Sequence, residues 1–61
     1  MEKKEIKLLN KAYDELYNLN SYYKYKYDYM LNELEEQVKN KGYEFKLNDK
    51  TQKFRLIKVK Q

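Results

Sequence analysis

Residues 43–59, which read YEFKLNDKTQKFRLIKV, decide the fold. Apolar and polar side chains alternate on both sides of the polar segment 48–52. A period of two predicts antiparallel strands at about 43–48 and 53–59, and the turn-favouring residues between them predict a hairpin. Matching the apolar faces sets the register. The predicted opposed pairs are Leu47 with Phe54, Phe45 with Leu56 and, on the other face, Lys46 with Arg55.

The same hairpin carries the net charge of the chain. Residues 1–42 contain eight lysines and eight acidic residues, so their charges cancel, whereas residues 43–61 contain six basic and two acidic residues, which leaves +4. A cationic ribbon on a neutral body favours a nucleic acid or an acidic protein surface as partner. The alternative is a lysine-rich edge that only prevents aggregation. The predicted contact residues of the ribbon are Lys46, Lys50, Lys53 and Arg55.

A first helix is predicted over residues 2–18. Its apolar side chains recur at spacings of three and four, which is typical of an amphipathic helix. The segment 18–21 is rich in residues that favour caps and turns, so we expect a tight connection there, with Asn20 or Ser21 as the next N-cap. The apolar face comprises Ile6, Leu9, Tyr13 and Leu16, widened by Tyr17.

Residues 21–41 carry two competing patterns. Tyrosines alternate with polar residues from 23 to 29, which is typical of a strand. A helical face also runs through the segment, and the residues after Met30 are good helix formers. We therefore predict a helix over 21–41, ended by Gly42 at C′. The alternatives are a strand followed by a shorter helix, or one long helix that continues from the first.

Tyrosines form a second candidate binding surface. On a helix, Tyr22, Tyr25 and Tyr29 fall on a stripe nearly opposite the core face. Exposed tyrosines are enriched at binding hot spots, and their rings also stack on bases, with Lys26 nearby for a phosphate. The alternative is that this stripe packs against the first helix, the hairpin or a second subunit.

Composition excludes several kinds of chemistry. The 61 residues make one domain, with no cysteine for disulfides and no histidine as metal ligand or general base. The single glycine rules out a glycine-rich phosphate loop, and the carboxylates of 28–36 are expected to form a solvated face. We expect a non-enzymatic protein without cofactor, metal or small-molecule substrate. Because so short a chain builds a small core, a homodimer remains open.

No apolar run has the length of a membrane span, so we expect no membrane association and a soluble, cytoplasmic protein. Residues encoded by AT-rich codons dominate the chain, and tiny proteins of this composition are typical of viruses and mobile elements. A regulator or inhibitor that acts inside a host cell is the corresponding expectation.

The order of elements also supports a resemblance. A helix from Leu34 that runs into Gly42 and Tyr43, followed by a basic hairpin to Val59, resembles the recognition helix and wing of a winged-helix domain. That resemblance implies direct DNA or RNA binding.

We thus expect a small α+β domain, a helical hairpin packed on a two-stranded antiparallel ribbon. It would dock on a protein or a nucleic acid through the basic hairpin and the tyrosine-rich helix. The alternatives are a winged-helix-like nucleic-acid binder and a homodimer without a ligand.

Overall fold

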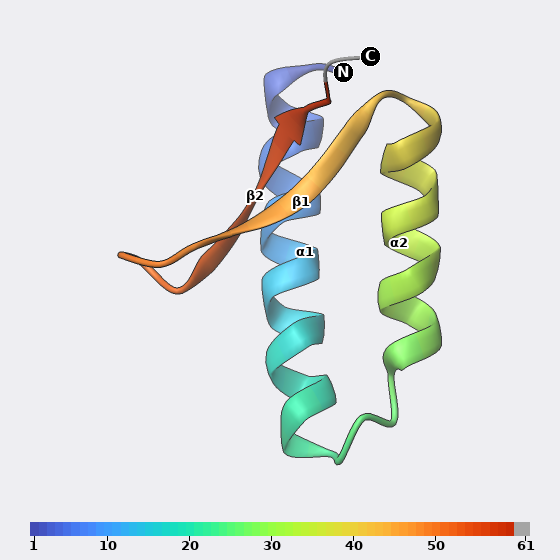
Figure 1. Cartoon of the computed structure of the whole chain (residues 1–61), viewed down its shortest axis with the longest axis vertical. Coiled ribbons are helices and arrows are strands. Elements are labelled where there is room, and N and C mark those ends of the chain that lie inside the picture. The colour runs from blue at the N-terminus through green and yellow to red at the C-terminus, as the bar shows by residue number, and fades with distance from the viewer. Residues whose placement is uncertain (60–61) are drawn as a thin grey trace.

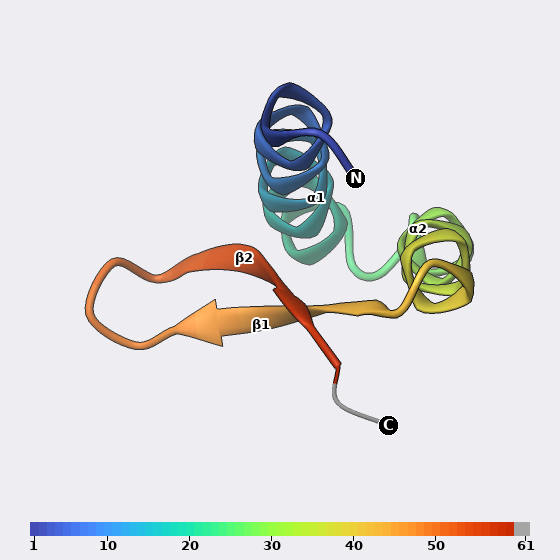
Figure 2. The ribbon, with the colours of Figure 1, turned by 90° about the horizontal axis from the view of Figure 1, so that it is seen from above.

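Two antiparallel helices form one layer of the computed structural model, and a β-hairpin forms the other (Figures 1 and 2). The structure describes residues 1–59. The predicted α+β fold is confirmed. The elements, in chain order, are α1 (Lys3–Tyr22), α2 (Asp28–Asn40), β1 (Tyr43–Asn48) and β2 (Lys53–Lys58).

The hairpin has the register that the apolar pattern predicts. Leu47 lies opposite Phe54, Phe45 opposite Leu56, and Lys46 opposite Arg55. The ladder extends one pair beyond the strands, because the Val59 N–H donates to the Gly42 carbonyl over 2.9 Å. Matching the apolar residues across the turn was sufficient to fix the register, because a one-residue slip would turn the phenylalanines to solvent.

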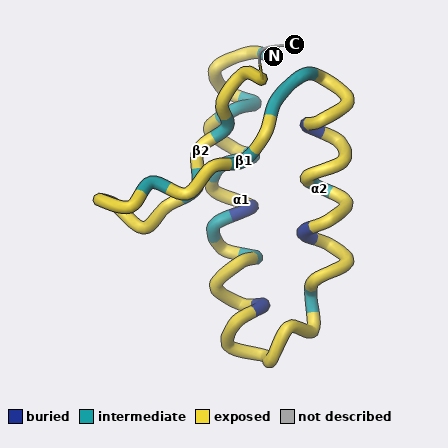
Figure 3. Tube along the Cα trace, in the orientation of Figure 1, coloured by how far each residue is buried: buried dark blue, intermediate teal, exposed yellow. Residues whose placement is uncertain are grey.

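The core is small, and its buried residues lie on the sides of α1 and α2 that face each other (Figure 3). Its buried apolar side chains are Tyr13, Leu31 and Val38. The Tyr13 ring stacks on Phe45 with centroids 4.0 Å apart and meets Phe54 edge-on at 4.8 Å. Each aromatic pair contributes about 0.5–1.5 kcal/mol beyond its buried area, so these contacts fasten the ribbon to α1.

The connection between the helices lies later in the chain than predicted. Helix α1 continues through residues 18–21 to Tyr22, so Asn20 and Ser21 are not N-caps of α2. Buried Asn20 instead acts across the connection: its Nδ2 donates to Asp28 Oδ1 over 2.7 Å, and its Oδ1 accepts from the Tyr27 N–H over 2.6 Å. The side chain of Asn20, near the end of α1, therefore fixes the position of the start of α2.

Residues 23–27 form a loop, so both the helix over 21–41 and the strand alternative are wrong for this segment. The single-long-helix alternative is also wrong, because the chain reverses here. Lys24 and Tyr25 adopt left-handed backbone angles, with φ of 56° and 67°. Two consecutive left-handed residues end a helix even though neither is glycine.

Gly42 ends α2 as the sequence predicts. Its φ of 83° is one that side-chain-bearing residues rarely adopt, and its N–H donates to the Lys39 carbonyl over 3.0 Å. The chain then passes directly into β1. Within residues 1–59, no helix has both the length and the apolar character that crossing a bilayer requires.

Candidate functional site

The ribbon has one face turned to the helices and one face turned to solvent. Alternation along each strand places Phe45, Phe54 and Leu56 on the inner face. The outer face presents basic side chains together with the carboxylate of Glu44, all of them exposed. We call Lys46, Lys53 and Arg55, with Lys50 at the turn, the cationic face.

Hydrogen bonds within the turn fix the position of the Lys50 backbone. Asn48 Oδ1 accepts from the backbone N–H of Lys50 over 2.9 Å, and the Asn48 carbonyl accepts from Gln52 N–H over 2.7 Å. An asparagine that bonds its own backbone two residues on is a preferred way to close such a turn. Lys50 therefore lies at the tip of an arm that extends past α1 (Figures 1 and 2).

Within residues 1–59, no carboxylate forms an ion pair with a residue of the cationic face. Among residues 1–59, the one ion pair is Lys41 with Glu5, at 3.6 Å and largely exposed. Lys46 and Arg55 are directly opposed across the strands, which is a mildly destabilising arrangement. A bound anion would reduce this repulsion.

Two side chains of α1 hold the outer edge of β2, and sequence reasoning did not foresee them. Asp14 Oδ1 accepts from the Phe54 N–H and Asn10 Oδ1 accepts from the Leu56 N–H, each over 2.7 Å. Four residues of helix rise about 6 Å and two residues of strand about 6.8 Å, so the acceptors and donors match in spacing. The available signal was a polar pair at i and i+4 beside the apolar face of α1.

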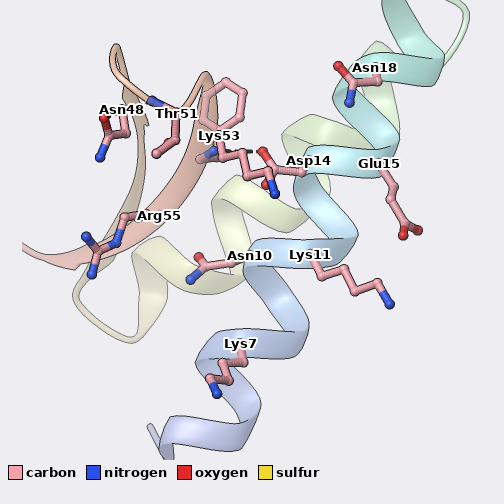
Figure 4. Close-up of a pocket in the computed structure, with 11 residues that line it drawn as sticks. Lys7, Asn10, Lys11, Asp14, Glu15, Asn18, Asn48, Thr51, Lys53 and Arg55 are labelled. Atoms are coloured by element: carbon pink, nitrogen blue, oxygen red, sulfur yellow. Dashed lines mark hydrogen bonds between the residues drawn. The ribbon is translucent and has the colours of Figure 1, made fainter.

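These hydrogen bonds cross a groove of about 730 Å³ between α1 and β2 (Figure 4). Asn10 and Asp14 reach toward the strand, while Arg55 points away from the helix. The lining mixes basic and acidic side chains, and the Asp14 carboxylate is engaged with the backbone. The groove therefore positions the ribbon, and two residues of the cationic face, Lys53 and Arg55, also line it.

The tyrosines are not brought together as predicted. Tyr22 ends α1, Tyr25 lies in the loop and Tyr29 lies in α2, so the expected helical stripe does not form. All three are exposed, at 79, 68 and 63%, and Lys26 is exposed in the same loop. Tyr22 meets Tyr23 edge-on at 4.9 Å. The group surrounds the turn between the helices, away from the hairpin tip (Figure 1).

Helix α2 has the opposite charge to the ribbon. It contains four acidic residues and one lysine, which gives a net charge of −3. Among residues 1–59, no three potential ligand side chains gather as a metal-binding group. The carboxylates of α2 are instead mostly solvent-exposed.

Tyr13 is a titratable residue with a shifted pKa, and it lies in the core. Burial, the nearby Glu35 carboxylate and the neighbouring Tyr17 together raise the pKa of Tyr13 to about 12. The Tyr13 phenol is therefore neutral at ordinary pH, as its stacked position under the ribbon requires.

Comparisons of the chain with protein-family models, with curated proteins and with solved structures found no match.

Proposed function

We propose that the protein is a non-enzymatic module that binds nucleic acid through the cationic face of its hairpin. The observation that carries the proposal is the exposure of these cations without an ion pair to a carboxylate among residues 1–59. A two-stranded ribbon fits the major groove of a duplex or lies along a phosphate backbone. The hydrogen bonds from α1 hold the ribbon rigidly, so binding does not have to order a flexible arm.

The charge of the helices supports one orientation. With a net charge of −3, α2 would be repelled by phosphates, so the molecule would approach with the ribbon forward and α2 away. In this arrangement the hairpin makes the contact alone. The proposal therefore retains the wing of the winged-helix resemblance and does not use α2 as a recognition helix.

The test is fluorescence anisotropy with a labelled duplex and a labelled single strand at several salt concentrations. Four phosphate contacts predict that affinity for the duplex falls roughly 150-fold for a fourfold rise in salt. In the K53E/R55E variant we expect a loss of more than about tenfold, with a shallower salt dependence. These two residues lie on β2 at the rim of the groove with α1, are exposed and make no side-chain hydrogen bond within residues 1–59.

The matched control is K24E/K26E, which makes the same change in net charge at two exposed residues of the loop. We expect its affinity to stay within about threefold of the unmodified protein. Equal losses in the two variants, or binding that ignores salt, would refute the proposal. Binding to polyglutamate with no binding to either nucleic acid would instead favour an acidic protein as partner.

A further inference from the structure

The two edges of the ribbon differ in whether side chains from the rest of the molecule hydrogen-bond to their backbone. On β2, the outward N–H groups of Phe54 and Leu56 are satisfied by Asp14 and Asn10. On β1, no side chain within residues 1–59 accepts from the backbone in this way. The ribbon therefore has one closed edge and one open edge.

Hydrogen-bonded and non-hydrogen-bonded pairs alternate along the two strands, and this alternation identifies the backbone groups of β1 that have no partner on β2. Gly42 and Val59 are hydrogen-bonded opposite each other, so the pairs 44/57 and 46/55 are hydrogen-bonded as well. The N–H and C=O groups of Tyr43, Phe45 and Leu47 must then point away from β2. Figure 2 shows α1 beside β2, and α2 next to the end of the ribbon where β1 begins. An open row of backbone groups of this kind is a template for another strand.

We propose that a second copy of this chain pairs with that edge, so that two β1 strands meet antiparallel about Phe45. In this register Tyr43 lies opposite Leu47 of the second copy and Phe45 opposite its counterpart, which uses every outward backbone group of 43–47. Glu44 then lies opposite Lys46 of the second copy, twice by symmetry, so within the dimer the cations of the cationic face left without an opposed carboxylate are Lys50, Lys53 and Arg55. The result is a continuous four-stranded sheet.

Charge selects this register over its neighbours. Residues whose backbone N–H and C=O groups point away from β2 can pair only with such residues of the second copy. The register can therefore shift only in steps of two residues. One step in one direction sets Glu44 against Glu44, and one step in the other sets Lys46 against Lys46. Opposite charges across strands stabilise and like charges destabilise, so pairing about Phe45 is favoured over both.

The closed edge limits the assembly to two copies. Because Asn10 and Asp14 occupy the far edge of each ribbon, the sheet ends at both sides and cannot grow into a fibre. Pairing also gives Leu47 an apolar neighbour; its side chain is 39% exposed in the single chain. For a chain with so few buried side chains, this added contact supplies the stabilisation that small domains need.

The first test is a charge exchange followed by sedimentation over a range of concentrations. In E44K, both cross-strand pairs become like-charged, and we expect the dissociation constant of the dimer to rise about tenfold or more. The E44K/K46E double variant restores opposite charges and should restore dimerisation at an unchanged net charge. A dimer unaffected by E44K would be formed elsewhere, and a monomer at every concentration would equally overturn the proposal.

The second test uses the absence of cysteine from the chain. A mixture of E44C and K46C chains should form a covalent heterodimer on mild oxidation, because directly opposed residues of a non-hydrogen-bonded pair lie within disulfide reach. Neither variant alone should cross-link, since identical positions are diagonal in this register and lie too far apart. Equal cross-linking of E44C alone would refute the register. Because neither test involves nucleic acid, its failure leaves the proposed binding activity standing.

Discussion

Replacing Asp14 with alanine should loosen the ribbon from α1. The carboxylate accepts a charge-assisted hydrogen bond from the half-buried Phe54 N–H over 2.7 Å. Hydrogen bonds to charged groups contribute about 1.5–3 kcal/mol, and an unsatisfied N–H has a further desolvation penalty, so we expect D14A to destabilise the fold by about 2 kcal/mol. A core of this size supplies only roughly 3–5 kcal/mol, so the change removes about half of the stability.

The assay is urea denaturation followed by circular dichroism, together with amide exchange at Phe54. D14N keeps an acceptor oxygen in the same place and should cost less than about 1 kcal/mol. E15A removes the neighbouring exposed carboxylate and should stay within about 0.5 kcal/mol of the unmodified protein. If D14A is no less stable than E15A, or if the Phe54 amide exchanges as fast in both, the hydrogen bond does not hold the ribbon.

Two further predictions concern the core and the loop. The Tyr13 pKa is raised from 10 to about 12 in the folded protein. The stability that this shift contributes is therefore intact below pH 10 and is lost between about pH 10 and 12. Over that range the unmodified protein should lose about 2–3 kcal/mol more than Y13F in urea denaturation, and parallel losses would contradict the assignment. K24G should stabilise the fold by about 0.5–1 kcal/mol, because residue 24 is left-handed with φ of 56°. The same change at Lys26, whose φ is not positive, should destabilise it by a similar amount, and a shared sign would count against loop strain.

The hairpin was predictable because its signals are local and agree with one another. Alternation, turn residues and the position of the phenylalanines all specify the same register, which the structure has. The glycine at 42 likewise has one conformational role, and the structure shows it there.

The helix connection was not predictable from local propensity. Asn20 has a side chain that usually marks a cap, yet here it is buried and bonds across the loop to Tyr27 and Asp28. The actual reversal occurs at Lys24 and Tyr25, which rarely adopt left-handed angles. Tertiary hydrogen bonds therefore override the local preference.

The candidate site was predicted in its composition and only partly in its geometry. Charge segregation along the sequence identified the basic residues, and alternation placed Lys46, Lys53 and Arg55 on one face. The bonds from Asn10 and Asp14 to β2 depend on how α1 lies against the strand, which no local pattern encodes. The tyrosine stripe failed because it presupposed a helix through residue 25.

The most direct test of the cationic face is an NMR titration of the isotope-labelled protein with a short DNA duplex at low salt. We predict that the largest shifts fall on Lys46, Lys50, Lys53 and Arg55 and disappear as salt is raised, while the exposed side of α2 stays unchanged. Shifts concentrated on α2 or on residues 22–29, or no shifts with either duplex or single-stranded nucleic acid, would contradict the account.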